Sequence, residues 1–430
     1  MLEEFERHIK TDFPFMEDHT FIIACSGGVD SVVLVHLCHQ LGLPFDLAHC
    51  NFNLRGEESD ADQYFVEQLA QKLGRTCHVK SFDTTADKGS IQMRARKLRY
   101  TWFQQLIDNK DYGYVLTAHH ADDDLETFVI NLSRGTGIEG LSGIPALNQN
   151  VVRPLLPFSR EWILAYATYH DIAWREDSSN IENKYLRNRI RHEIIPRMKL
   201  LHPNFMANFL LTRDFLHEAS VLQKDYAKTL RQKLFVNQGD TIKIDIEQLR
   251  ALEPSKAYLY LLFHDFGFTQ WQDIVHLMTG MSGKEVHSRT HRLLKNRDHL
   301  LLASRIQGTV SAFEIHHFQR ELLHPMRLKI TEVEKMGVAS ANTLYVDKEK
   351  LNYPLMIRKW QKGDYFYPLG MVGKKKVSKF FKDEKMDVFS KERQWVLCSD
   401  AAIVWVIGKR ADDRFKVTKA TQNIIKMTVQ

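Results

Sequence analysis

The chain has 430 residues, of which 44% are hydrophobic and 26% charged. At about 150 residues per domain this length predicts two or three domains, and the composition excludes collagen-like, low-complexity and wholly disordered proteins. The formal net charge of +6 would indicate a polyanion site only if the surplus were concentrated in one segment. Apolar runs are far shorter than the roughly 20 residues that cross a bilayer. The first residues are acidic where a signal peptide is basic, so we expect a cytoplasmic protein without a membrane partner.

Residues 20–145 alternate short apolar segments with longer amphipathic segments. Continuous apolar runs predict buried strands, and apolar residues repeated at helical spacing predict helices. The predicted strands cover residues 21–25, 45–50, 77–82 and 112–118. The predicted helices cover residues 31–41, 58–73, 91–107 and 122–133. Strands separated by such helices form βαβ units, so we expect an α/β domain with a Rossmann-like parallel sheet covered on both faces.

The pattern after about residue 159 is mainly helical. Ser159 is suited to cap a helix that runs through Tyr169, and residues 200–233 are long, charged and periodic. Further helices are predicted near 254–265 and 270–279, and one strand over 293–303. Later short alternating runs, glycines and clustered lysines favour a small α+β domain. The predicted domains are residues 1–200, a mainly helical region 201–350, and a basic domain 351–430.

A glycine-containing loop joins the first predicted strand to the first predicted helix. Adjacent glycines let backbone N–H groups approach an anion, and a helix N-terminus adds partial positive charge. We therefore predict that a nucleotide's phosphates bind Ser26, Gly27, Gly28, Val29, Asp30 and Ser31. Asp30 would repel a bare phosphate, so we expect it to hold Mg²⁺ or a polar substrate group. The alternative is a plain strand–helix turn that Asp30 caps.

A second polar cluster, His-Ala-Asp-Asp-Asp-Leu-Glu-Thr over residues 120–127, follows the fourth predicted strand. Asp123 and Glu126 are three residues apart and share a helix face, at the same sheet edge as the phosphate loop. Acidic residues also cap helix N-termini, and that alternative stays open. A loop rich in backbone donors follows, with Arg-Gly-Thr-Gly at 134–137 and Gly-Leu at 140–141.

Two segments concentrate cations. Residues 184–192 interleave cations with Tyr and Asn, which suits phosphate contacts and base stacking, although a solvated helix face is the alternative. Residues 356–420 contain sixteen lysines and arginines and eight acidic residues, and this surplus of eight exceeds that of the whole chain. The lysines there, with Phe380, Phe381 and Trp360 nearby, suggest a second contact with RNA. The residues of these two segments predicted to bind a nucleic acid are Arg187, Asn188, Arg189, Arg191, Lys374, Lys375, Lys376 and Lys379.

The loop Ser-Gly-Gly-x-Asp-Ser after a first strand resembles that of the N-type ATP pyrophosphatases, which include tRNA thiolases and tRNA(Ile)-lysidine synthetases. Further motifs keep the order of the lysidine synthetases. These are the runs at 49–55, 95–100, 120–127, 134–137, 153–156, 176–180 and 187–191, and Gly-Asp at 363–364. Phe52 and Asn53 depart from the family's usual His and Gly, and Asp124 from its usual Gln.

This resemblance implies an adenine nucleotide alpha hydrolase-like fold and a ligase that modifies the wobble cytidine in the CAU anticodon of tRNA(Ile). ATP adenylates the cytosine 2-oxygen, with loss of pyrophosphate. The amine of free L-lysine then attacks carbon 2, AMP leaves, and codon specificity changes from AUG to AUA. Asp123 and Glu126 are the expected site for lysine's ammonium, and one of them could accept its proton.

Three further residues have candidate roles in this chemistry. Arg96 or Arg99 could neutralise phosphate charge, although either could instead pair with a nearby acid. His120 could orient the cytosine or assist proton transfer, although a buried structural histidine is the alternative.

Two other functions compete with this one. A tRNA 2-thiolation enzyme with the same loop would need reactive cysteines near the site. The five cysteines include no Cys-x-x-Cys pair, although Cys25 and Cys50 lie at strand ends. A non-catalytic tRNA-binding protein with a decayed loop is the alternative from another class. The intact 26–31 run and the Asp123/Glu126 pair argue against decay.

Overall fold

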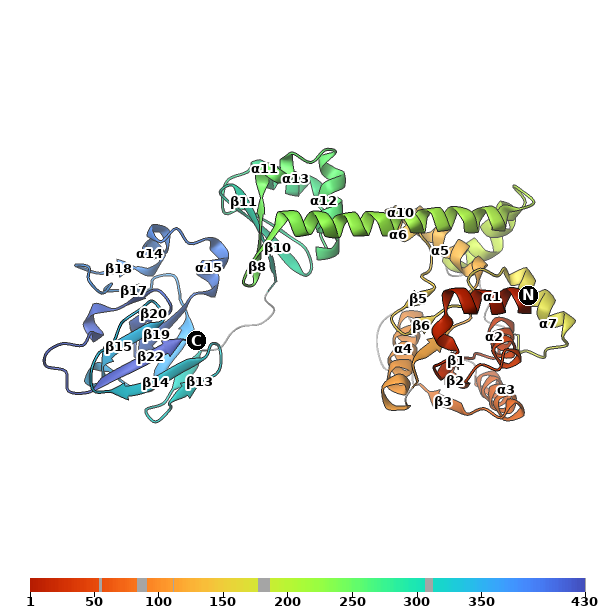
Figure 1. Cartoon of the computed structure of the whole chain (residues 1–430), viewed down its shortest axis with the longest axis horizontal. Helices are drawn as coiled ribbons and strands as arrows, with labels where there is room; N and C mark the ends of the chain where they lie inside the picture. The colour runs from red at the N-terminus through yellow and green to blue at the C-terminus, as the bar shows by residue number, and fades with distance from the viewer. Residues whose placement is uncertain (54–55, 83–90, 111, 177–185, 306–311, 430) are drawn as a thin grey trace. The chain divides into compact units, whose positions relative to one another are not determined.

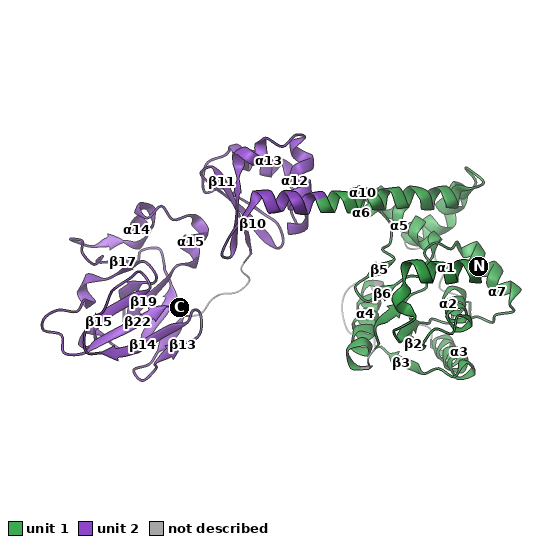
Figure 2. Cartoon of the chain, in the orientation of Figure 1, with its two compact units in different colours: residues 1–225 green, residues 226–430 purple. Residues whose placement is uncertain are grey.

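The computed structural model describes residues 1–430 except 54–55, 83–90, 111, 177–185, 306–311 and 430. It forms two compact units, residues 1–225 and 226–430, and the boundary falls within α10 (Phe205–Leu234) (Figure 2). Among the described residues, no helix combines the length and apolar character that a membrane crossing needs.

Unit 1 is built on a six-stranded sheet with the strand order β3-β2-β1-β4-β6-β5 (Figure 1). The strands are β1 (Phe21–Ala24), β2 (Phe45–Asn51), β3 (Cys77–Ser81), β4 (Tyr114–Leu116), β5 (Leu147–Asn148) and β6 (Val151–Val152). All pairings are parallel except that of β5 with β6. This confirms the predicted parallel α/β fold. Because β1 lies between β2 and β4, the chain changes direction across the sheet there, where ligands of open α/β sheets bind.

Helices cover both faces of this sheet. The helices of unit 1 before α10 are α1 (Leu2–Asp12), α2 (Val29–Gln40), α3 (Glu57–Leu73), α4 (Ile91–Lys110), α5 (Ala121–Arg134), α6 (Ile138–Leu141), α7 (Arg160–Tyr169), α8 (Leu186–Arg189) and α9 (Ile195–Lys199), with a π-helical segment at Ile190–Ile194. Phe21 and Ile23 pack in the core shared with α1, α2 and α7, whereas Ile22 packs in the core under α4. Alternate side chains of β1 are thus buried on opposite faces, which explains its continuous apolar run.

Unit 2 begins with the helical region that was predicted. After α10 come α11 (Ile246–Arg250), α12 (Ser255–Phe263) and α13 (Trp271–Thr279). A five-stranded antiparallel sheet accompanies them: β7 (Phe235–Gln238), β8 (Thr241–Asp245), β11 (His299–Ser304), β10 (His291–Asn296) and β9 (Glu285–His287). The single strand predicted over 293–303 is wrong, because a polar turn with Arg297 at φ +55° separates β10 from β11.

The remaining strands form antiparallel sheets around a shared core. One sheet contains β12 (Phe313–Ile315), β16 (Leu355–Lys359), β19 (Trp395–Ser399), β20 (Ala402–Val406) and β21 (Arg410–Ala411). Another contains β13 (Glu321–Leu322), β14 (Leu328–Val333), β22 (Ile424–Val429) and β15 (Thr343–Asp347). The pair β17 (Tyr365–Phe366) with β18 (Lys375–Lys376) lies beside α14 (Val377–Asp383), and Phe389 of α15 (Val388–Arg393) packs with residues of β10 and β11. Since β22 pairs with β14 and β15, the residues 313–347 belong with the C-terminal strands, not with the predicted middle region.

Candidate active site

The phosphate loop lies between the end of β1 and the start of α2. Gly27 has φ +88°, a left-handed conformation that glycine adopts without strain. Ser31 Oγ donates to the Gly28 carbonyl at 2.9 Å and accepts from the Ser26 N–H at 3.2 Å, which holds the turn together. Gly28 occupies the N-cap of α2 and no side chain caps it. The first N–H groups of α2 therefore lie where an anion could accept from them.

Asp30 and His120 connect this loop to the second cluster. Asp30 Oδ2 lies 3.7 Å from His120 Nε2, and Asp30 Oδ1 is buried without a hydrogen-bond partner among the described residues. His120 is the N-cap of α5, and its side chain is 4% exposed. Burial acts to lower the pKa of His120, but its interactions with Asp30 and Asp123 outweigh burial and raise it. The carboxylates around the buried His120 side chain therefore favour its protonated form.

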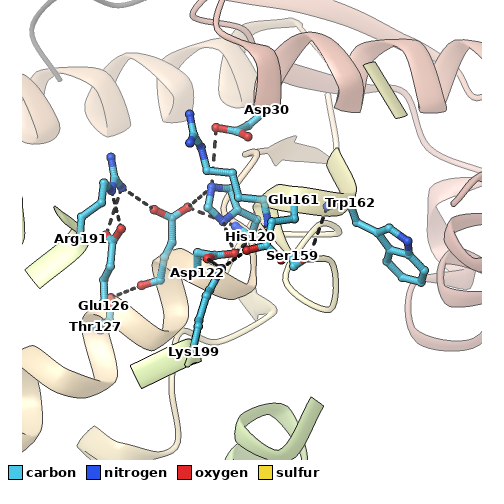
Figure 3. A network of polar contacts seen from close by, with 12 residues as sticks. Asp30, His120, Asp122, Glu126, Thr127, Ser159, Glu161, Trp162, Arg191 and Lys199 are labelled. Atoms are coloured by element: carbon cyan, nitrogen blue, oxygen red, sulfur yellow. Dashed lines mark hydrogen bonds and ion pairs between the residues drawn. The ribbon is translucent and has the colours of Figure 1, made fainter. Parts of the chain in front are cut away.

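Four residues form what we call the acid–arginine cluster: Asp123 and Glu126 of α5, Arg187 of α8, and Arg191 of the π-helical segment. Arg187 Nε donates to Glu126 Oε2 at 2.7 Å, and Arg191 Nε donates to Glu126 Oε1. Asp123 Oδ1 lies 3.1 Å from Arg187 Nη2 and 3.3 Å from Arg191 Nη2. Figure 3 shows the Arg191 guanidinium directed at Glu126. The predicted lysine-binding acids and two of the predicted tRNA-binding arginines thus lie together.

Burial differs sharply within this cluster. The Glu126 side chain is 2% exposed and that of Asp123 14%, whereas Arg187 is 42% and Arg191 33% exposed. Burial would raise the pKa of Asp123, but the charges of His120, His119 and Arg187 lower it below its usual range. Asp123 also accepts from the His120 backbone N–H at 3.2 Å, so the capping alternative is realised together with the ion pairs.

Two further acids of α5 have partners that sequence reasoning did not identify. Asp122 accepts from the Arg160 N–H at 2.8 Å and pairs with Lys199 at 2.6 Å, as Figure 3 shows for Lys199. Asp124 is fully buried, accepts from the Ile144 N–H at 2.6 Å and pairs with Arg213 at 3.1 Å. Both cations are distant from α5 in sequence, and no local pattern marks them as partners.

A glycine makes room for Asp124. Gly143 has φ +85°, and a Cβ atom there would lie 2.6 Å from Asp124 Oδ1. The carboxylate therefore occupies the space that a side chain at position 143 would need.

Arg96 and Arg99 lie on α4. The Arg96 guanidinium is 4.9 Å from the centroid of the Tyr100 ring, and that of Arg99 is 5.5 Å from the Phe52 ring. Neither forms an ion pair with an acid in the described part of the chain. Burial lowers the pKa of His119 to about 4, and the charges of Arg153, Arg96 and Arg187 also lower it, whereas Asp123 acts to raise it. The charge of Arg96 therefore reaches His119, the residue next to His120.

The other predicted tRNA-binding residues are mostly exposed. Arg189 is 63% exposed and lies 3.8 Å from Glu193, and Asn188 lies beside it in α8. Lys374, Lys376 and Lys379 are exposed, whereas Lys375 pairs with Asp383 at 2.7 Å. The motif residues 54–55 and 177–180, with Lys184 and Tyr185, lie outside the described residues.

The aromatic residues near these lysines are not part of an exposed RNA-binding surface. Phe380 and Phe381 are 3% and 0% exposed and pack in a core with Val377 and Val396. Trp360 packs against that core and donates its indole N–H to the Lys391 carbonyl at 2.6 Å. These rings stabilise the domain and are not available for base stacking.

Comparison with known proteins identifies three regions of the chain. Residues 1–198 match the family model of the PP-loop domain, residues 237–305 the TilS substrate binding domain, and residues 355–427 the TilS substrate C-terminal domain. The tRNA(Ile)-lysidine synthase of Bacteroides thetaiotaomicron is 36% identical over 97% of this chain and 97% of its own length. That of Parabacteroides distasonis is 38% identical over 95% of each chain. Among solved structures, the U34-tRNA thiolase NcsA from Methanococcus maripaludis aligns with a TM-score of 0.42 and 17% identity, covering 50% of this chain and 78% of that one.

Proposed function

Because the chain belongs to the tRNA(Ile)-lysidine synthase family, we propose that it joins L-lysine to carbon 2 of the wobble cytidine in the CAU anticodon of tRNA(Ile). It is an ATP-dependent ligase of tRNA processing that forms lysidine. The observation that carries the proposal is the carboxylate pair of buried Glu126 and partly exposed Asp123, of which Asp123 is joined through His120 to Asp30 of the phosphate loop. A cation-binding site beside an ATP site is what the ligation of a cationic amino acid requires.

ATP phosphates are proposed to bind residues 26–31. The uncapped N-terminus of α2 and the Ser26 hydroxyl supply donors, while the Ser31 hydroxyl holds the turn through the Gly28 carbonyl, and Arg96 or Arg99 of α4 supplies positive charge. The buried, unpartnered Oδ1 of Asp30 suits a Mg²⁺ ligand. The described residues contain no group of three protein ligands, which fits an ion whose remaining ligands are phosphate oxygens and water. When bound, Mg²⁺ would neutralise phosphate charge.

The first step is adenylation. The cytosine 2-oxygen attacks the α-phosphorus of ATP, the bond to the β-phosphate oxygen breaks, and pyrophosphate leaves. This step needs positioned donors and no protein nucleophile. We propose that His120, whose pKa is raised, orients the cytosine or moves a proton near the α-phosphate.

The second step is attack by lysine. Its ammonium is proposed to bind Asp123 and Glu126, and one carboxylate accepts a proton so that the neutral amine can attack carbon 2. The C–N bond forms, the C–O bond to the phosphate breaks, and AMP departs. The tRNA is proposed to contact Asn188 and Arg189 in unit 1 and Lys374, Lys376 and Lys379 in unit 2. The reaction is proposed to take place in the cytoplasm.

The thiolation alternative is disfavoured by the state of the cysteines. Burial is the largest influence on each of two thiols near the sheet, and it raises the pKa of Cys50 and of Cys77 to about 12. Sulfur transfer needs a thiolate, and such thiols are almost entirely protonated at neutral pH.

The proposal is tested with ATP, Mg²⁺, labelled lysine and bulk bacterial tRNA. We expect label to enter tRNA with release of AMP, and the product to resist mild alkaline deacylation because lysine is joined to a base. Alkali-labile label would indicate an aminoacyl ester, and tRNA binding without AMP release would support the non-catalytic alternative. Either result would contradict the proposal.

A further inference from the structure

The acid–arginine cluster is already saturated with cations from the same chain. Both Glu126 oxygens are bound, Oε2 by Arg187 and Oε1 by Arg191. Asp123 Oδ1 is shared by the same two guanidinium groups. The two arginines therefore occupy the position that the proposed function gives to the ammonium of lysine.

The arginines are held by a segment whose backbone is fixed and whose charged ends are accessible. Ile190 and Ile195 are 4% and 5% exposed and pack with Leu125 and Phe209. Arg187 and Arg191 are 42% and 33% exposed although their carboxylate partners are buried. The guanidinium groups can therefore turn toward solvent while the segment stays docked.

Phosphate and carboxylate compete for the same feature of arginine. A guanidinium donates two parallel hydrogen bonds to either anion, so exchanging one partner for the other keeps the geometry. Arg187 and Arg191 are four residues apart, and Arg191 lies in a π-helical segment, a structure that often occurs at functional sites. Exposed Arg189 lies between them and extends a cationic surface that an RNA backbone could approach.

We propose that Arg187 and Arg191 form a gate on the amino-acid subsite. Without tRNA they pair with Asp123 and Glu126 and exclude lysine. Phosphates of bound tRNA draw one or both guanidinium groups away, and the freed carboxylates bind the substrate ammonium. This inference rests on the proposed function and adds an order to it: lysine binds after tRNA. By linkage, lysine also strengthens tRNA binding by the same factor.

The test is lysine binding to the full chain by titration calorimetry, with and without tRNA(Ile), in the presence of a non-hydrolysable ATP analogue. We expect lysine to bind at least about tenfold more tightly with tRNA, a coupling within the usual allosteric range. In the double variant R187Q/R191Q, lysine should bind without tRNA about as tightly as wild type binds it with tRNA. The matched control is R197Q, which removes an exposed arginine of α9 outside the cluster and should keep the wild-type coupling.

Several outcomes would overturn the gate. Equal lysine affinity with and without tRNA in the wild type would do so, and this measurement needs no variant to fold. Weaker lysine binding in R187Q/R191Q would show instead that the arginines bind the lysine carboxylate. If the double variant unfolds, R187Q alone, which leaves Arg191 in place, should still raise tRNA-free affinity. A wild type that binds no lysine even with tRNA would refute the proposed function itself.

Discussion

Two cationic regions looked alike in sequence and differ in structure. Arg187 and Arg191 are in ion pairs with buried carboxylates of α5, whereas Lys374, Lys376 and Lys379 are exposed beside and within α14. In the first region the charges are already neutralised, and removing one leaves a buried partner alone. In the second region the charges face water and remain available to a polyanion. The number of cations in a segment thus predicts binding only after their partners are known.

The first region uses arginine and the second uses lysine, and this choice matches the difference in their partners. The arginine fork donates to two oxygens at once and suits a shared, partly buried carboxylate pair. Lysine is a compact, strongly hydrated charge on a flexible stem, which suits a salt-sensitive contact with an RNA backbone. Four experiments test how the buried and the exposed charged groups differ.

The largest effect is expected for Arg213→Met, which leaves fully buried Asp124 without its cation. Breaking a buried pair from one side costs about 3–5 kcal/mol. Urea unfolding of the full chain should show this loss in the transition that unit 1 dominates. Lys376→Gln, at an exposed lysine, should change stability by less than about 0.5 kcal/mol. Equal effects of the two variants would contradict the contrast between the regions.

The next effect is expected for Asp30→Asn in the phosphate loop. We expect AMP formation to fall about 10²–10³-fold, the scale for loss of one electrostatic group at a reacting centre. Stability should be nearly unchanged, because the Asp30 side chain is 30% exposed and makes no short ion pair. Glu193→Gln, at a 48% exposed acid of the π-helical segment, is the control and should keep the wild-type rate. A wild-type rate in Asp30→Asn would remove this residue from the proposed site.

A smaller effect is expected when Lys374, Lys376 and Lys379 are all changed to Gln. We expect tRNA affinity to fall about tenfold at low salt and the slope of log affinity against log salt to become shallower by about 2–3, because each phosphate contact contributes about 0.9. Lys375→Gln should change the slope less, since Lys375 is paired with Asp383. Filter binding at several salt concentrations measures both. An unchanged slope in the triple variant would show that these lysines make no phosphate contacts.

The smallest effect is expected for thiol alkylation, where burial is the largest influence on the pKa of each reacting group. With pKa values of about 12, Cys50 and Cys77 should react with iodoacetamide far more slowly than a free thiol at pH 7. Their reaction rate should rise about tenfold per pH unit until the protein unfolds. Brief treatment should leave lysidine formation intact. Rapid labelling with loss of activity would revive the thiolation alternative, and mass spectrometry of the labelled peptides would decide it.

Much of unit 1 could be predicted because its signals are local. A strand buried on both faces shows a continuous apolar run, as in β1, and Ser159 caps α7 by accepting from the Trp162 N–H at 3.2 Å. In unit 2, Val236 of β7 is 56% exposed, and β14 pairs with the sequence-distant β22. Such strands carry weak local signals, and their pairing depends on tertiary contacts.

The residues of the candidate site could be identified from the sequence, but the contacts between them could not. The 26–31 loop and Asp123 with Glu126 are marked by spacing, but arginine chemistry is the same toward carboxylate and phosphate. Sequence alone therefore could not decide which anion Arg187 and Arg191 face. The suggestion that Phe380 and Phe381 belong to an RNA contact could have been avoided. Val377, Phe380 and Phe381 are spaced as residues on the buried face of a helix, which predicts burial rather than exposure to RNA.

The close approach of Asp124 to Gly143 has a consequence for sequence variation. Position 143 accepts no side chain without displacing a carboxylate that also holds the Ile144 N–H and Arg213. A single added methyl group there would compete for space with Asp124, near the hydrogen bonds and ion pair that it makes. We therefore expect variation at residues 124 and 143 to be coupled, because a side chain at 143 needs the space that the Asp124 carboxylate occupies.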